Sequence, residues 1–186
     1  MSVFNSAPPK INKINLITWL KRNYDIFNNK KISLKELNSE RDKNFLITLN
    51  KKSYFVLKIS NSLESIKFLE LQDYVLTELN TRKSIKKFIP NKIHKSIKTY
   101  IDKNNRSCHV RILGYIEGKM FAKCKHSNEL EISLGSLIGN LSKELQNLGI
   151  LSIGVKAINY GSFDLNDDVG NTYGTFSAHD QVFTLG

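Results

Sequence analysis

The stretch NFLITLNKKSYFVLKIS, Asn44–Ser60, decides the fold of this chain. Two runs rich in β-branched and aromatic residues, Asn44–Leu49 and Tyr54–Ser60, lie on either side of the polar link Asn50-Lys51-Lys52. Two such runs joined by a short polar link are the pattern of a β-hairpin. We therefore expect two antiparallel strands in this region.

The second run of this hairpin places a lysine among hydrophobic residues. Side chains alternate between the two faces of a strand, so Phe55, Leu57 and Ile59 share one face while Val56 and Lys58 share the other. Lys58 is therefore expected to project from the face opposite the aromatic one.

The rest of the chain adds strands and helices around this hairpin. Apolar residues at helical spacing predict three helices, and short apolar runs predict three more strands. The helices are expected at Ile11–Phe27, from Ser62 to near Asn80 and at Glu129–Leu148, and the strands at Ile32–Leu37, Lys92–Ile101 and Cys108–Ile116. Gly149 is a candidate helix C-cap. The prediction is an α+β fold: a five-stranded antiparallel sheet, one helix inserted after the third strand and packed on the sheet, and flanking helices.

The segment 150–186 differs in composition from what precedes it. Lys156 is its only lysine or arginine, whereas Asp164, Asp167, Asp168 and Asp180 make it acidic. Carboxylates can bind Mg²⁺, but a solvated acidic turn is the better interpretation here because no catalytic motif accompanies them. We assign no metal ligands and expect this tail to be unrelated to the domain or truncated.

Composition and charge exclude several classes of protein. The 186 residues, 40% hydrophobic and 24% charged, suit a soluble globular domain, and neither an apolar run of about 20 residues nor a secretory leader is present. We expect a cytoplasmic protein without a membrane segment. Cys108 and Cys124 stand far apart, which indicates neither a zinc site nor a disulfide framework. The net charge of +11 admits a polyanion, but no recognition element organises the basic pairs, so nucleic-acid binding is disfavoured.

A polar turn upstream of Lys58 suggests a function. Ser39–Asn44 separates two expected strands, and backbone N–H groups in such a turn can meet phosphate oxygens. A lysine at the centre of the next strand can reach the same phosphates. An exposed lysine alternating out of a strand is the ordinary alternative, but the neighbouring turn and helix favour phosphate contact.

Four ordered motifs carry a family resemblance: SERDKNFL (39–46), YFVLKIS (54–60), ESIKFLELQDYVLTEL (64–79) and VRILGYIEG (110–118). Together they resemble the N-terminal region of aminoglycoside-phosphotransferase-like small-molecule kinases, above all hydroxylysine-kinase-like proteins and the kinase domains fused to class III aminotransferases. The resemblance extends from about Pro9 to about Leu148. It implies an N-terminal helical segment at 1–30, a kinase-like N-lobe at 31–118, a post-hinge helix at 119–149 and the tail at 150–186.

The resemblance also implies roles for particular residues. The turn would cover the phosphates, a strand lysine would contact the α- and β-phosphates, and the hinge backbone would meet adenine. The residues at these positions are Ser39, Arg41, Asp42 and Asn44 in the turn, Lys58 on the strand, and Leu113 and Tyr115 in the hinge. In kinases a carboxylate on the next helix holds this lysine. Gln72 occupies that position here, and Glu70 is the alternative partner.

The implied activity is transfer of a phosphoryl group from ATP, with Mg²⁺, to a hydroxyl of a small amine-containing substrate. The catalytic Asp and the metal-binding Asp of the second kinase lobe have no matching motif, so we assign no catalytic residue and expect no turnover by this chain alone. The expected partners are a nucleotide and a protein that supplies the missing C-lobe. The alternative is a non-catalytic, kinase-like protein-interaction module.

Overall fold

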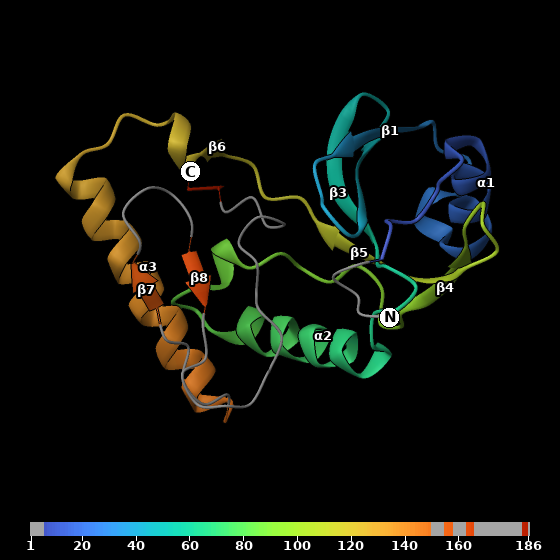
Figure 1. The fold of residues 1–186 in the computed structure, drawn as a ribbon. Coiled ribbons are helices and arrows are strands. Elements are labelled where there is room, and N and C mark those ends of the chain that lie inside the picture. The colour runs from blue at the N-terminus through green and yellow to red at the C-terminus, as the bar shows by residue number, and fades with distance from the viewer. Residues whose placement is uncertain (1–5, 150–154, 158–162, 166–183, 186) are drawn as a thin grey trace. The chain divides into compact units, whose positions relative to one another are not determined.

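The computed structural model describes residues 6–149, 155–157, 163–165 and 184–185 (Figure 1). The chain divides into two compact units. The first consists of Met1–Tyr74 and Asn91–Tyr115, and the second of Val75–Pro90 and Ile116–Gly186. We describe each unit by itself.

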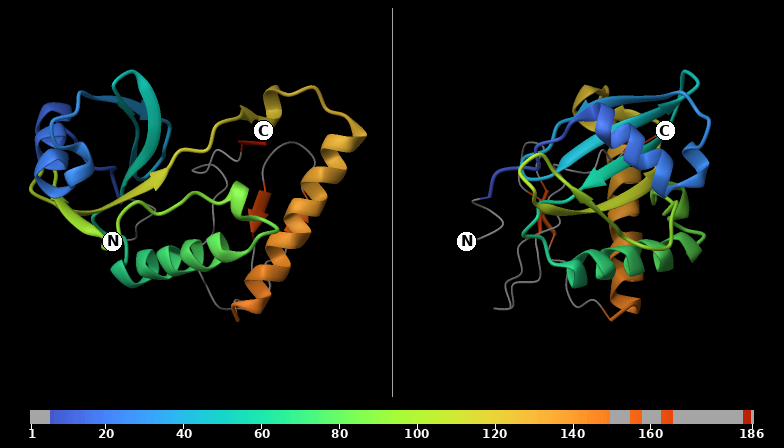
Figure 2. Two further views of the ribbon diagram at one scale, coloured as in Figure 1. Left: turned by 180° about the vertical axis from the view of Figure 1, so that it is seen from behind. Right: turned by 90° about the vertical axis from the view of Figure 1, so that its right-hand side faces the viewer.

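A five-stranded sheet forms the centre of the first unit (Figures 1 and 2). Its strands lie in the order β1-β2-β3-β5-β4, and every neighbouring pair is antiparallel. The α+β class and the five-stranded antiparallel sheet are thus confirmed. The strands are β1 (Ile32–Leu37), β2 (Lys43–Leu49), β3 (Lys52–Ile59), β4 (Lys98–Ile101) and β5 (Ser107–Gly114).

The predicted hairpin is the pair β2–β3. Leu49 pairs with Lys52, so the loop consists of two residues, Asn50 and Lys51, and Lys52 belongs to the strand. Asn50 and Lys51 have φ angles of 49° and 68°. Positive φ at both central residues is what a type I′ turn requires, and this turn suits the right-handed twist of two adjoining strands.

The predicted helix Ile11–Phe27 is interrupted near its end. Helix α1 covers Lys13–Asn23, and the Asn12 side chain caps it by accepting hydrogen bonds from the first-turn N–H groups. Tyr24 adopts an extended conformation with φ of −141°, and a short 3-10 helix, η2 (Asp25–Phe27), follows. The extended residue allows the Tyr24 ring to pack into the core, where it contacts the ring of Phe27 edge to face.

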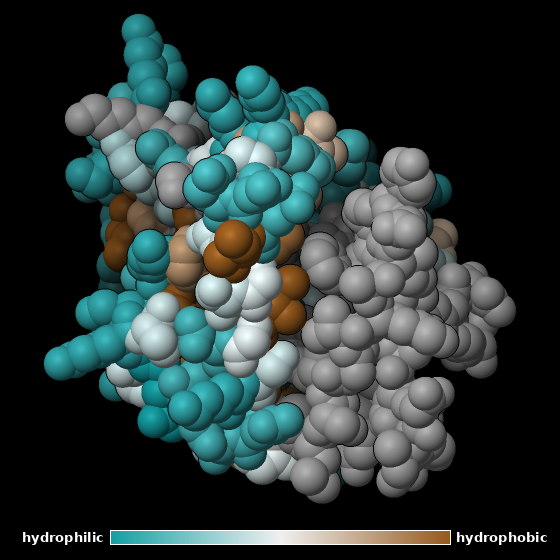
Figure 3. Space-filling view, turned by 90° about the vertical axis from the view of Figure 1, so that its left-hand side faces the viewer, coloured by the Kyte–Doolittle hydropathy of each residue, from teal (hydrophilic) through white to brown (hydrophobic). Residues whose placement is uncertain are grey.

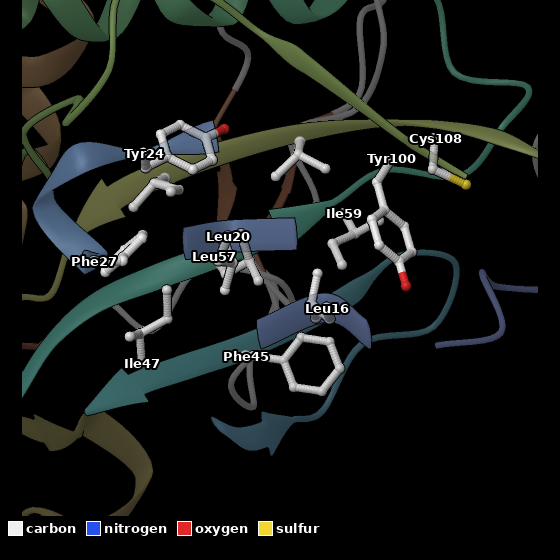
Figure 4. Packing of buried hydrophobic residues seen from close by; sticks show 12 residues of the cluster. Leu16, Leu20, Tyr24, Phe27, Phe45, Ile47, Leu57, Ile59, Tyr100 and Cys108 are labelled. Atoms are coloured by element: carbon white, nitrogen blue, oxygen red, sulfur yellow. The ribbon is translucent and has the colours of Figure 1, made fainter. Parts of the chain in front are cut away.

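One face of the sheet packs against α1 and η2 to form the core of the first unit (Figure 4). The N-terminal helical segment therefore shares a core with the sheet. Phe55 also packs against this cluster, so the predicted assignment of Phe55, Leu57 and Ile59 to one face is confirmed. The buried residues of the cluster are Leu16, Leu20, Tyr24, Phe27, Phe45, Ile47, Leu57, Ile59, Tyr100, Cys108, Val110 and Ile112.

The fourth strand is shorter than predicted. The strand expected at Lys92–Ile101 begins only at Lys98, and residues 92 and 93 contact β5 separately. Lys92 forms an isolated bridge with Leu113, and the Ile93 N–H donates to Ile112 O at 3.0 Å. The backbone turns between these two stretches, where the Ser96 N–H donates to His94 Nδ1. Lys92 is thereby placed beside β5 without being part of β4.

Helix α2 (Ile66–Thr81) follows β3, as predicted, but starts four residues after Ser62. Its residues up to Tyr74 belong to the first unit and the remainder to the second. A 3-10 helix, η3 (Lys86–Phe88), follows it. Helix α2 thus comes between β3 and β4 in the chain.

The second unit has its own hydrophobic cluster, in which Val75, Leu79, Ile85, Ile89 and Leu145 are buried. Leu145 belongs to α3 (Asn128–Asn147), which confirms the predicted third helix. After α3, Gly149 has a φ of 75° and its N–H donates to Gln146 O at 2.9 Å, a conformation typical of a helix C-terminus.

Short strands complete the second unit: β6 (Lys119–Met120) pairs with β9 (Thr184–Leu185), and β7 (Val155–Ala157) pairs with β8 (Phe163–Leu165). A 3-10 helix, η4 (Phe121–Lys123), follows β6. Asp164 lies in β8, whereas Asp167 and Asp168 are outside the described residues. Among the described residues, no helix is both long and apolar enough to cross a membrane. The described surface seen in Figure 3 is mainly hydrophilic, with hydrophobic residues in small patches.

Candidate functional site

Three polar residues lie side by side across the centre of the sheet. Asn44 of β2 pairs with Lys58 of β3, and Lys58 pairs with Arg111 of β5. Their neighbours in sequence, such as Phe45, Leu57 and Ile112, face the α1 core, so these three residues occupy the opposite face. They are nevertheless buried, with exposed fractions of 3% for Asn44, 7% for Lys58 and 6% for Arg111. Two buried cations on neighbouring strands are uncommon, because burial of a charge is costly.

A carboxylate from α2 holds two cations on this face. Asp73, which is 4% exposed, accepts a hydrogen bond from Arg111 Nη1 through Oδ1 at 3.3 Å. Its other oxygen, Oδ2, lies 2.6 Å from Lys92 Nζ. Lys92 is placed there by its bridge to Leu113 of β5. We call the three cations Lys58, Lys92 and Arg111, together with the Asp73 carboxylate, the cationic cluster.

The guanidinium of Arg111 has few partners for so deeply buried a group. Its side chain is 5% exposed, and within the described part of the chain its one hydrogen bond is the 3.3 Å contact with Asp73. Its Nε is buried without a hydrogen-bond partner in the same part. Burial lowers the pKa of Arg111, and the charges of Asp73, Asp42 and Glu64 act against this shift. Arginine keeps its charge in proteins, so Arg111 is a buried cation whose Nε has no partner among the described residues.

The turn before β2 covers residues 39–42 and is shorter than predicted, because Lys43 and Asn44 already pair with β3 as part of β2. This turn is tied to the connection between β3 and α2. Asp42 Oδ1 accepts the Asn61 N–H at 3.0 Å, and Arg41 O accepts a hydrogen bond from Asn61 Nδ2 at 3.3 Å. Ser39 Oγ donates to Asp42 O within the turn. These contacts fix the turn beside the sheet but engage the side chains of Ser39 and Asp42 in internal hydrogen bonds. Asn44 begins the buried row, and its Oδ1 has no partner among the described residues.

The predicted hinge uses two of its N–H groups internally. Gly114 N–H donates to Asn91 O at 2.7 Å, and Tyr115 N–H donates to Tyr54 O at 2.8 Å. Leu113 is 4% exposed and pairs with Val56. An adenine contact by the N–H of Tyr115 would require the hydrogen bond to Tyr54 to open. The adenine contact of Leu113 and Tyr115 stays a prediction.

The sequence analysis missed Asp73, the carboxylate of α2 that faces the sheet. Gln72 is half-buried and Glu70 is exposed, whereas Asp73 is buried. Residues four apart share one face of a helix, and Asp73 lies four residues after the buried Leu69. This spacing could have identified Asp73.

The arrangement can bind an anion. Lysine supplies a compact charge and arginine a fork of donors that matches two oxygens of a phosphate or carboxylate. No protein-family model, curated protein or solved structure matches this chain.

Proposed function

We propose that the first unit binds the phosphates of a nucleotide and corresponds to the N-lobe of an aminoglycoside-phosphotransferase-like kinase. One observation carries this proposal: Lys58 is buried in the middle strand of the sheet, and a buried carboxylate, Asp73, lies on the helix that follows. Kinases use a third-strand lysine to hold phosphates and a helix carboxylate to position it.

The arrangement of elements supports the same interpretation. The strand order β1-β2-β3-β5-β4, with α2 inserted between β3 and β4, fits the lobe that the sequence motifs imply. The turn at residues 39–42 leads into β2 close to Lys58, because Asn44, the second residue of β2, pairs with Lys58. A nucleotide phosphate near Lys58 would therefore lie close to this turn.

The proposal assigns binding to this chain and no catalytic step. ATP would bring Mg²⁺ as its counter-ion, and we assign no residue to the metal. Phosphoryl transfer to a hydroxyl of a small amine-containing compound requires an aspartate that positions the hydroxyl. In this proposal a partner protein contributes that residue.

Calorimetric titration with Mg-ATP tests the proposal. Lys58→Met keeps the aliphatic stem of this buried residue but removes its charge, so it should weaken ATP binding by about tenfold or more. Lys35→Met is the matched control, because Lys35 is an exposed lysine on the edge strand β1. It removes the same charge and should leave the affinity unchanged. Absence of ATP binding by the wild-type chain, or equal affinity of Lys58→Met and the wild type, would refute the proposal.

A further inference from the structure

Arg111 is deeply buried, forms few hydrogen bonds and has no role in the proposed nucleotide binding by Lys58. Its position is fixed by β5, where it is the direct cross-strand neighbour of Lys58. Side chains of directly paired residues leave the same face with Cβ atoms about 5 Å apart. Two cations in this relation repel each other, and both are more than nine-tenths buried. If these residues served only to stabilise the fold through an ion pair, one of the two cations would be enough.

Asp73 does not satisfy Arg111 well. A strong arginine–carboxylate pair is bidentate, with two parallel N–H···O bonds of about 2.8 Å. Within the described ranges, Arg111 makes a single hydrogen bond to Asp73, at 3.3 Å, and the other oxygen of Asp73 lies much closer to Lys92, at 2.6 Å. Buried groups with unused donors are rare in folded proteins and call for an explanation such as a bound ion.

Asp42 and Glu64, which influence Arg111 from farther away, have other contacts. Asp42 accepts the Asn61 N–H, and Glu64 Oε1 accepts the Ser65 N–H. Neither forms a hydrogen bond or an ion pair with Arg111 among the described residues. Within the described part of the chain, Arg111 Nε is thus left without a partner and can donate to an anion.

We propose that Arg111 is a second phosphate-binding residue, which contacts the same polyphosphate as Lys58, and that Asp73 positions its guanidinium. This inference rests on the proposed function and extends it, because the ligand must then carry at least two anionic groups. A polyphosphate fits this requirement, with one group near Lys58 and another in the fork of Arg111.

The burial of the cluster indicates the side from which the ligand enters. Lys92 is the most exposed of the three cations, with 21% of its side chain accessible. It also shares Asp73 with Arg111. A polyphosphate that contacts Lys92 first would compete with Asp73 for this lysine and lead on to Arg111.

Arg111→Met tests this inference, with Arg22→Met as the control. Both variants lose one positive charge, but Arg22 is exposed on α1, which packs on the other face of the sheet. Calorimetry with AMP, ADP and ATP should show that Arg111→Met loses about tenfold or more in affinity for ADP and ATP. AMP should bind the variant and the wild type with similar affinity. Inorganic triphosphate, titrated separately, distinguishes a nucleotide site from a general polyphosphate site.

Thermal unfolding without ligand separates ligand binding from a structural role. Arg111→Met leaves the buried Asp73 with one cation fewer, so the unliganded variant can unfold at a lower temperature, but the stabilisation by saturating ATP should become smaller if Arg111 binds phosphate. A lower unfolding temperature with an unchanged ATP-induced shift would mean that Arg111 is a structural residue, and would overturn the inference. If the wild type binds ATP and Arg111→Met binds it equally well, this inference fails while the proposed function stands. If the wild type binds neither nucleotide nor triphosphate, both fail.

Discussion

Replacement of Asp102 by asparagine should destabilise the first unit in a pH-dependent way. Asp102 lies in the turn between β4 and β5, and its side chain is fully buried. Its carboxylate accepts hydrogen bonds from the backbone N–H groups of Lys10, Asn104 and Arg106, at 2.8–3.1 Å. It also accepts two from the Arg106 guanidinium, at 2.8 and 3.0 Å.

These contacts connect the turn to the N-terminal segment. Arg106 also donates to Ala7 O at 3.0 Å and to Pro8 O at 2.9 Å, and Lys10 is bound directly by Asp102. Loss of the carboxylate charge therefore weakens both the turn between β4 and β5 and the attachment of residues 7–10.

The pKa of Asp102 gives the magnitude. Burial raises this pKa, but the hydrogen bonds from Arg106, Lys10 and Asn104 outweigh burial and lower it from 3.8 to about 2. A lowering of this size corresponds to about 2 kcal/mol of stability. Because the pKa is lower in the folded state than in the unfolded state, this contribution is fully present above about pH 4. It is lost as the pH falls through about 2. Asp102→Asn should therefore cost about 2 kcal/mol at pH 7 and much less near pH 2.

Urea unfolding followed by the fluorescence of Trp19 measures this effect. Trp19 is the sole tryptophan, and its ring lies 5.5 Å from that of Tyr100 in the first unit. Asp25→Asn is the control, since Asp25 is an exposed carboxylate in η2. Equal urea midpoints for Asp102→Asn and the wild type at pH 7 would refute the reasoning. So would a difference that stays constant down to pH 2.

Two further predictions concern the turn of the hairpin and the thiols. Lys51→Gly should stabilise the first unit by about 0.5–1 kcal/mol, because Lys51 has a φ of 68°, which glycine adopts without strain; a lower urea midpoint would contradict this. Burial, followed by the charge of Asp102, raises the pKa of Cys108 to about 11, whereas Cys124 is partly exposed. At pH 8 a disulfide reagent should therefore modify Cys124 quickly and Cys108 only on unfolding, and equal rates for the two thiols would contradict the structure.

Strands with a local sequence signal were predicted better than strands whose bounds depend on distant contacts. The bounds of β1 were predicted correctly, since a short apolar run between polar turns is a local signal. The start of β4 at Lys98 was not, because the turn at His94 depends on a distant contact. The His94 ring packs against Tyr24, with centroids 5.1 Å apart. Tyr24 also ends α1, which periodicity alone does not reveal.

The residues of the candidate site likewise differ in how well the sequence predicts them. The face from which Lys58 projects followed from strand alternation, which requires no knowledge of the partner strand. Arg111 lies within one of the quoted motifs but went unrecognised, because its pairing with Lys58 joins strands more than fifty residues apart in sequence. The contact of Lys92 with Asp73 likewise depends on the bridge to β5.

Labelling with an acyl phosphate of ATP shows whether Lys58 lies beside bound phosphates. In such a reagent a carboxylic acid is joined to the terminal phosphate, and a lysine amine that lies beside the phosphates attacks the acyl carbon, forms an amide and releases ATP. Peptide mass spectrometry then identifies the modified lysine. The account predicts that Lys58 is the principal labelled residue and that excess Mg-ATP protects it. Labelling spread over the exposed lysines, and unaffected by Mg-ATP, would contradict a phosphate-binding role for Lys58.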